Sequence, residues 1–154
     1  MPSRRSQIEL TEEEQKQFLE DGWTLQVASV GHKGYPHLVA MWYVLIDGEI
    51  EFTTFGKSQK ILNLRRNPKI TVMLESGKGY SELKGLAIEG EAEIIEDNAH
   101  TAMVMGRVGA KYNGLPIPTE SSEQQMKAAA KRVAVRIKAE NVVSWDHSKL
   151  GGRY

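Results

Sequence analysis

Alternating apolar and polar positions predict strands over most of the first hundred residues. A short helix over residues 11–21 comes first. Thr11 and Glu14 fit a capping box, the three glutamates after Thr11 favour a helix N-terminus, and an apolar pair follows. Residues 23–30 then alternate between apolar and polar side chains, which predicts a strand. Residues 36–46 are almost continuously apolar, so we expect a strand that is buried on both faces.

A strong hairpin signal, Asp47-Gly48, connects that run to an alternating strand over residues 49–54. These three strands should therefore form an antiparallel meander. Further strands are expected at residues 69–75, 80–96 and 132–145. Within the second of these, Gly85 and Gly90 predict bulges or bends of the kind that a small barrel needs.

Two helices are expected between the last two strands. Asp97 caps a helix that runs to about residue 112, and Ser121 or Ser122 opens a shorter one to about residue 130. The 154 residues favour a single domain of mainly β structure with peripheral helices, built on a six-stranded antiparallel barrel. Its parts are a helical arm (1–22), barrel strands (23–96) that include a basic helix (58–66), helices and a loop (97–130), and a last strand with the tail (131–154).

The stretch 49–68, EIEFTTFGKSQKILNLRRNP, joins a strand to a helix through a glycine turn. Ser58 is a suitable N-cap, and Pro68 ends the helix because the residue before a proline is pushed out of the helical region. Free N–H groups and the helix dipole favour an anion at such a helix N-terminus, so we predict a phosphate cradle there. No acid occurs between residues 57 and 69, and the basic residues are Lys57, Lys60, Arg65, Arg66 and Lys69.

An aromatic segment, Met41-Trp42-Tyr43, precedes this cradle and suits the planar part of a ligand with a phosphate tail. If the segment is a strand, Trp42 and Tyr43 point to opposite faces, so one of them can line a pocket while the other packs. The alternative for the basic residues of the cradle is a solvated helix face that serves only solubility.

Charge and composition exclude several classes of function. Twenty basic and 20 acidic residues give a net charge of zero, so no overall field attracts nucleic acid or a membrane surface. The absence of cysteine excludes disulfides, thiolate metal sites and cysteine nucleophiles. No apolar run approaches the ~20 residues of a spanning helix, and the start MPSRRSQIEL lacks the apolar core of a secretory signal. A soluble, cytoplasmic protein is therefore expected.

Familiar catalytic patterns do not occur in the chain. It has no dinucleotide fingerprint, no Walker loop and no serine nucleophile elbow. The four histidines lack metal-ligand spacing, so we predict no metal site. Glu89, Glu91 and Glu93 share one face of a strand, where a solvated surface is a simpler explanation than a paired-carboxylate site.

A family resemblance is carried by the segments GYPHLVAMWYVLIDGEIEFTT, KSQKILNLRRNPKITVMLE and YSELKGLAIEGEAEI and by the ending VVSWDHSKLGG. From about residue 23 to residue 152 the chain resembles the pyridoxamine 5'-phosphate oxidase-like superfamily, whose fold is the FMN-binding split β-barrel. Within it the chain is most similar to the branch of deazaflavin (F420)-dependent oxidoreductases. The resemblance implies a homodimer with two cofactor sites at the interface, each built by both subunits.

The resemblance also implies which residues would hold the cofactor. Its phosphate and ribityl chain would contact Ser58 and Lys60, with Lys57 or Gln59, and then Thr53 and Thr54. Its ring would lie along Met41, Trp42 and Tyr43, and the second subunit would contribute from around Lys84 and from the Trp145–Lys149 tail.

The activity implied by the resemblance is hydride transfer from reduced F420 to a small organic acceptor, with water, Tyr43 or His37 as the proton donor. The alternatives are an FMN-dependent oxidase or reductase of the same fold and a non-enzymatic flavin- or haem-binding protein. The sequence departs from the oxidase itself at Gln59, where that enzyme has a basic residue, and in the tail WDHSKLGGRY, which only partly matches its arginine-rich end. The basic residues Lys57, Arg65 and Arg66 are compatible with the larger and more anionic tail of F420.

Overall fold

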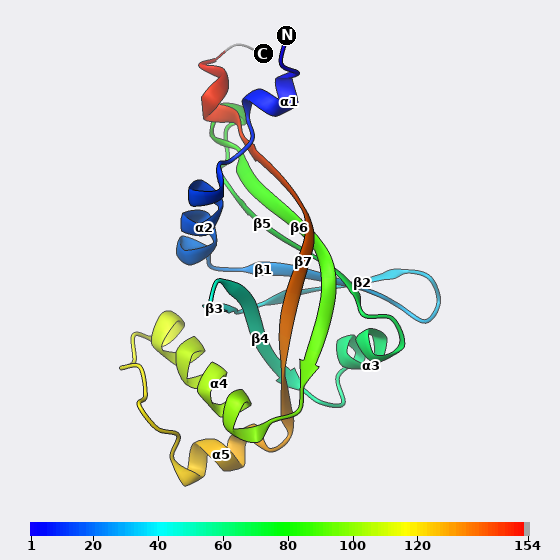
Figure 1. The fold of residues 1–154 in the computed structure, drawn as a ribbon, viewed down its shortest axis with the longest axis vertical. Helices are drawn as coiled ribbons and strands as arrows, with labels where there is room; N and C mark the ends of the chain where they lie inside the picture. Colours follow the sequence, from blue (N-terminus) through cyan, green and yellow to red (C-terminus); the bar gives the residue numbers. More distant parts are fainter. Residues whose placement is uncertain (153–154) are drawn as a thin grey trace.

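The computed structural model describes residues 1–152, in which seven antiparallel strands form one curled sheet (Figure 1). The strands are β1 (Leu25–Val30), β2 (Pro36–Met41), β3 (Val44–Ile46), β4 (Glu49–Phe55), β5 (Lys69–Ser76), β6 (Lys84–Ile95) and β7 (Arg132–Asp146). Their order across the sheet is β2-β1-β5-β6-β7-β4-β3. The helices are α1 (Arg4–Gln7), α2 (Glu12–Asp21), α3 (Gln59–Arg66), α4 (Asn98–Asn113) and α5 (Glu123–Ala129), with 3-10 turns η1 (Tyr80–Glu82) and η2 (His147–Leu150).

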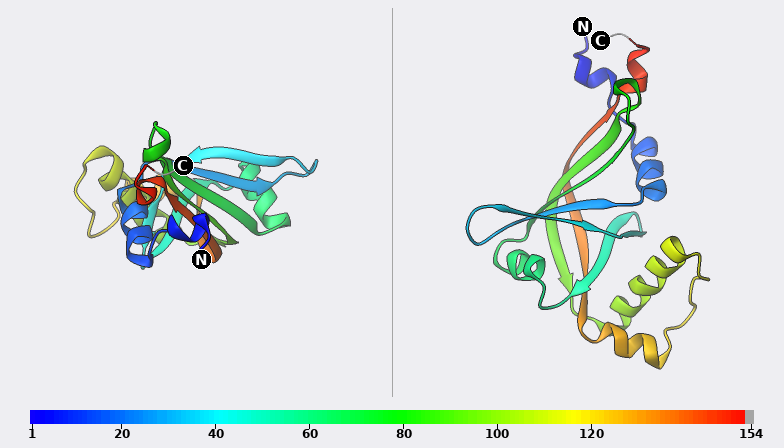
Figure 2. Two further views of the ribbon diagram at one scale, coloured as in Figure 1. Left: turned by 90° about the horizontal axis from the view of Figure 1, so that it is seen from above. Right: turned by 180° about the vertical axis from the view of Figure 1, so that it is seen from behind.

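Strands β5, β6 and β7 run along the length of the molecule, with α1 and η2 near one end and α3, α4 and α5 toward the other (Figures 1 and 2). Helix α4 packs on β3, β4 and β7, and α3 packs on β1 and β6. One cluster of buried apolar side chains, to which β1, β4, β5, β6 and β7 contribute, forms the main core. A mainly β fold with peripheral helices is therefore confirmed. Among the described residues, no helix is both long and apolar enough to cross a membrane.

The apolar run 36–46 forms two strands, so the sheet has seven strands rather than six and the expected meander is wrong. The chain leaves the sheet at Trp42 and Tyr43, between β2 and β3. Strand β2 pairs with β1, whereas β3 pairs with β4 at the opposite edge of the sheet. Because β2 is an edge strand, it is also not buried on both faces, and Leu38 is 64% exposed.

Side chains of α4 replace the missing strand partners at this break. The N–H of Tyr43 donates to the hydroxyl of Tyr112 (3.1 Å), and the carbonyl of Tyr43 accepts from Nζ of Lys111 (3.4 Å). The Tyr112 hydroxyl in turn donates to the carbonyl of Trp23, 2.7 Å away. These bonds satisfy buried backbone groups that a continuous strand would pair with its neighbours. A contact between distant parts of the chain thus ends β2, and a local alternation pattern cannot report such a contact.

A second attachment holds the start of α4 against the sheet. The carboxylate of Glu51, on β4, is fully buried. Its two oxygens lie 2.6 Å from Nε2 of His100 on α4 and 3.2 Å from Nε of Arg136 on β7. A buried carboxylate is costly unless it is paired and hydrogen-bonded, and both partners are present here. This charge cluster therefore fixes one end of α4, and Tyr112 fixes the other.

Local signals read from the sequence are confirmed at the helix starts and at the tight hairpin. The caps are Thr11 for α2, Asp97 for α4 and Ser122 for α5. Asp47 (φ 51°) and Gly48 (φ 81°) both have positive φ, as a two-residue hairpin of this type requires. Glu14 does not complete the expected capping box, because its carboxylate pairs with Lys149 at 2.7 Å. Helix α1 and the two 3-10 turns were not predicted.

The two glycines of β6 have different roles. The pairing of β6 with β7 shifts register between Glu89 and Gly90, which confirms the irregularity expected there. A Cβ on Gly90 would lie 2.2 Å from the carbonyl oxygen of Lys138. Gly85, in contrast, lies in regular pairing, and a Cβ there would meet the ring of Trp145 at 2.4 Å. Gly90 thus permits a close approach of two backbones, and Gly85 makes room for an indole.

We expect Gly90→Ala to lower the free energy of unfolding by about 1–3 kcal/mol, because a rigid backbone carbonyl must move to admit the methyl group. Urea unfolding followed by circular dichroism measures the difference. Gly79→Ala is the matched control, because a Cβ there has no neighbour closer than 3.7 Å. Equal stability of the two variants would contradict this explanation of the register shift.

Candidate functional site

The turn from β4 into α3 brings three polar side chains together. The hydroxyl of Thr54 accepts a hydrogen bond from Nζ of Lys60 (2.9 Å) and donates one to the hydroxyl of Ser58 (3.4 Å). Ser58 is the N-cap residue of α3, yet its side chain makes no capping hydrogen bond. Within residues 1–152, the backbone N–H groups of Gln59 and Lys60 also lack a hydrogen-bond partner. The start of α3 therefore presents unpaired donors beside a lysine, which is the arrangement that binds an anion.

Arg132 is a further cation at this turn, and the sequence analysis missed it. It starts β7 directly opposite Phe55, the last residue of β4, and its guanidinium lies 4.1 Å from the centre of the Phe55 ring. Burial lowers the pKa of Lys60, and the positive charge of Arg132 lowers it further. Within the described residues, neither cation has a carboxylate partner at ion-pair distance. The pattern Lys131-Arg132 at the start of the last strand is basic, but only the strand register places it here.

The remaining residues predicted for the cradle take different positions. Lys57 is exposed in the turn between β4 and α3. The amide of Gln59 donates to the side chain of Asn63 (2.8 Å), which in turn donates to Ser29 of β1 (3.1 Å). Gln59 thus helps to attach α3 to the sheet. Thr53 is half-buried and points to the face of β4 opposite to Thr54.

The structure separates the roles of the aromatic segment. Trp42 is 46% exposed and stacks on Tyr112, with ring centres 4.5 Å apart and an interplanar angle of 11°. Met41, at the end of β2, is half-buried. Tyr43 is completely buried, and its hydroxyl donates to the carbonyl of Leu19. Tyr43 is therefore the aromatic residue of this segment that packs in the core, and a pocket lined by Trp42 stays a prediction.

Burial of Tyr43 also removes it as the proton donor considered from the sequence. Its side chain has no exposed surface, and burial raises the pKa of its hydroxyl well above the usual value. His37 keeps a place beside the cradle, because it lines a hollow of about 260 Å³ together with Gln59 and Asn63. Among the described residues its buried Nδ1 has no hydrogen-bond partner.

Lys84 and Trp145 lie at the other end of the sheet from the cradle of their own chain. Lys84 pairs with Asp146 where β6 begins and β7 ends, whereas Arg132 and Phe55 mark the opposite end of β7. An extended strand of this length separates its two ends by tens of ångströms, because each residue adds about 3.3 Å. Their contribution to a cofactor site from a second subunit stays a prediction.

The structure thus combines a curled antiparallel sheet with a candidate anion cradle at a strand-to-helix turn. Residues 11–146 match the family described as "Pyridoxamine 5'-phosphate oxidase". Because this match spans most of the chain, the protein belongs to the pyridoxamine 5'-phosphate oxidase family, as the sequence resemblance implies.

Solved structures support the same fold. The conserved hypothetical protein Rv2991 from Mycobacterium tuberculosis is 41% identical, with a TM-score of 0.90 over 99% of this chain and 95% of that one. An F420 reductase is 23% identical, with a TM-score of 0.64 over 82% and 94% of the two chains. The haem storage protein HutZ from Vibrio cholerae is 18% identical, with a TM-score of 0.66 over 89% and 97%. No curated protein matches the chain.

We expect Lys60→Met to leave the free energy of unfolding near neutral pH no lower than that of the wild-type chain. Because the pKa of Lys60 is lowered in the folded state, folding disfavours its charged form at any pH below that lowered pKa. The penalty disappears as the pH rises from the lowered pKa to the ordinary one, so any advantage of the variant should shrink by about pH 10.

Urea unfolding at the two pH values measures this difference. Lys57→Met is the matched control, because Lys57 lies in the same turn and is exposed. A clear loss of stability in Lys60→Met near neutral pH, with no change in the control, would contradict the picture of a destabilising cation.

Proposed function

We propose that this protein is an oxidoreductase that binds deazaflavin F420 and uses it to reduce a small organic acceptor. The observation that carries the proposal is the cradle formed by Thr54, Ser58, Lys60 and Arg132, in which cations and free N–H groups converge without an acid. Such a site suits the phosphate of a flavin-type cofactor. Ser58 and Lys60 would hold that phosphate, with Lys57 and Arg132 beside it.

The ring of the cofactor would lie along Met41 and Trp42, which the break between β2 and β3 leaves at the surface. When bound in its reduced form, the cofactor supplies the hydride. The protein's part is to bind and orient it and to exclude water. No nucleophilic side chain is needed, in agreement with a chain that lacks a catalytic constellation. With Tyr43 in the core, His37 or water remains as the source of a proton.

F420 is preferred over FMN because the cradle carries more positive charge than one phosphate requires. Lys57 and Arg132 are available for the extra anionic groups of the F420 tail. The F420 reductase among the similar structures has the same fold and supports this choice. FMN in the same cradle is the second candidate. A flavin- or haem-binding protein without enzymatic activity is the third, because the haem storage protein HutZ also has this fold.

We also propose that two copies form a cytoplasmic homodimer in which each cradle is completed by the partner. The end of β1, the turn that follows it and edge strand β2 expose Val30, Tyr35 and Leu38, an apolar surface suited to a second copy. Lys84 and the tail Trp145–Lys149 lie too far from the cradle of their own chain to serve it, so only a partner could bring them there.

A parallel fluorescence titration with F420 and with FMN tests the proposed cofactor. We expect F420 to bind tightly and FMN weakly, because the additional cations attract the longer anionic tail of F420. The reverse order would assign the protein to the FMN-dependent relatives. Failure of both to bind below about 100 μM, equivalent to about −5.5 kcal/mol, would overturn the cradle assignment and make haem the next ligand to test.

Lys60→Ala should weaken cofactor binding by about 1.5–3 kcal/mol, the scale of a charge-assisted hydrogen bond. The same titration measures it. Lys69→Ala is the control, because Lys69 is exposed at the start of β5 in the same basic stretch and has no ion pair among the described residues. Unchanged affinity of Lys60→Ala would contradict the assignment of the phosphate to α3.

A further inference from the structure

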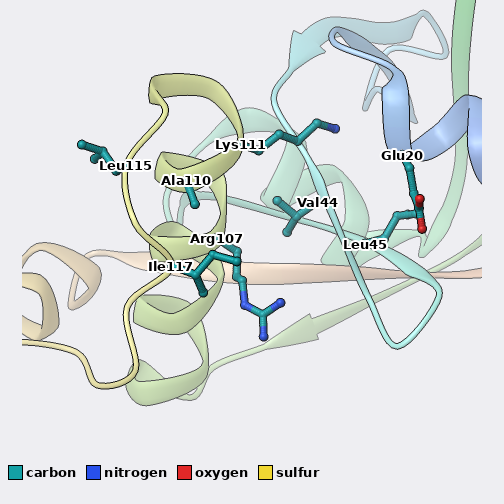
Figure 3. Close-up of a pocket in the computed structure, with 8 residues that line it drawn as sticks. All are labelled: Glu20, Val44, Leu45, Arg107, Ala110, Lys111, Leu115 and Ile117. Atoms are coloured by element: carbon teal, nitrogen blue, oxygen red, sulfur yellow. The ribbon is translucent and has the colours of Figure 1, made fainter.

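A second candidate site lies on the other side of β4, in a cleft of about 390 Å³ between α4, β3 and the loop that follows α4 (Figure 3). Val44 and Leu45 of β3 form one wall, and Leu115 and Ile117 of the loop form another. Arg107 and Lys111 of α4 enter it as well. The cleft therefore combines apolar walls with a few polar groups, the usual composition of a small-molecule site.

The loop wall is held close to α4 by glycines. Gly114 has a positive φ of 65°, which ends α4 and turns the chain back along the helix. A Cβ on Gly106 would lie 2.9 Å from the ring of Pro118, and a Cβ on Gly109 would lie 3.5 Å from the side chain of Leu115. The loop thus packs directly on the helix backbone. It nevertheless leaves Leu115 and Ile117 57% and 59% exposed, and both residues line the cleft.

The cleft has an excess of positive charge. Arg107 and Lys111 lie one helical turn apart, and Arg107 has no ion pair or hydrogen bond among the described residues. Lys111 lies over the ring of Tyr43, 3.8 Å from its centre. Burial lowers the pKa of Lys111 to about 8, against the opposing charge of Asp21. The acid that lines the cleft is Glu20 of α2, so two cations face one carboxylate.

We propose that this cleft binds a small aliphatic monocarboxylate, with its carboxylate on Arg107 and its chain on Val44, Leu45 and Leu115, while the ammonium of Lys111, which contacts Tyr43, adds positive charge nearby. A guanidinium can donate two parallel hydrogen bonds to the two oxygens of a carboxylate, and a neighbouring ammonium adds positive charge without such a paired contact. The volume of the cleft suits a small ligand. The site is separate from the cradle, so it does not depend on the identity of the cofactor.

Hexanoate is the probe, and the full-length, ¹⁵N-labelled protein without added cofactor is the sample. An NMR titration should shift the backbone signals of Ala110, Leu115 and Ile117 in a saturable manner. Hexanamide, which keeps the chain but lacks the charge, should bind about tenfold more weakly or worse, as should acetate, which lacks the chain. Equal binding of hexanoate and hexanamide, or shifts confined to other parts of the chain, would overturn the proposal.

Arg107→Gln should weaken hexanoate binding by about tenfold or more, and it should fold normally because Arg107 is exposed. Lys127→Gln removes the same charge from an exposed position on α5, outside the cleft, and should leave the affinity unchanged. An unchanged affinity in Arg107→Gln would place the carboxylate elsewhere and overturn the proposal. So would an equal loss in both variants, which would indicate only a general charge effect.

The pH dependence gives an independent readout. Because the pKa of Lys111 is about 8, hexanoate affinity should fall as the pH rises through that value and Lys111 loses its proton. The other charged groups that face Lys111 are Glu20 and Asp21 of α2 and Arg107 of α4. Arg107→Gln should keep the pH-dependent fall at its lower affinity. A wild-type affinity that is constant from about pH 7 to about pH 9 would exclude Lys111 from the site.

Discussion

The hydroxyl group of Tyr112 holds together the three parts of the chain on which the fold depends. It accepts the N–H of Tyr43 and donates to the carbonyl of Trp23, so α4, the start of β1 and the break between β2 and β3 meet at one atom. Without these bonds the backbone at Tyr43 would be buried with unpaired polar groups, which costs about 1–3 kcal/mol for each group. The break sends β2 and β3 to opposite edges of the sheet.

In the proposed cradle, unlike at Tyr112, several polar and charged groups are left without hydrogen-bond or ion-pair partners among residues 1–152. Lys60 donates to the hydroxyl of Thr54, and Arg132 lies over the ring of Phe55. This arrangement disfavours the free protein, so the same charges that lower its stability would raise the affinity for an anion in the proposed site. The paired carboxylate of Glu51, a few residues earlier on β4, is balanced within the chain and serves structure alone.

The parts of the fold that depend on local chemistry could be predicted from the sequence. The caps at Thr11, Asp97 and Ser122 and the hairpin at Asp47-Gly48 each need only the residues nearby. The proposed cradle could be predicted because Ser58 and Lys60 are neighbours in sequence. Several of the missed features involve residues distant in sequence but close in space.

Three such features stand out. The strand break depends on Tyr112, nearly seventy residues away, and apolar alternation carries no information about it. Arg132 joins the cradle only through the register of β4 with β7, which no single segment specifies. Tyr43, rather than Trp42, is buried, and its hydroxyl donates to the carbonyl of Leu19. The two-fold periodicity of a strand does not indicate which of the two side chains is buried.

The loop after α4 has a consequence for how this protein can diverge from its relatives. Its outward-facing side chains, Leu115 and Ile117, are more than half exposed, so exchanging them costs little folding free energy. The glycines beneath the loop and the attachments at both ends of α4 belong to the rigid part of the structure. Evolution can therefore reshape the cleft by single substitutions in the loop, while the barrel and the cradle behind it stay the same.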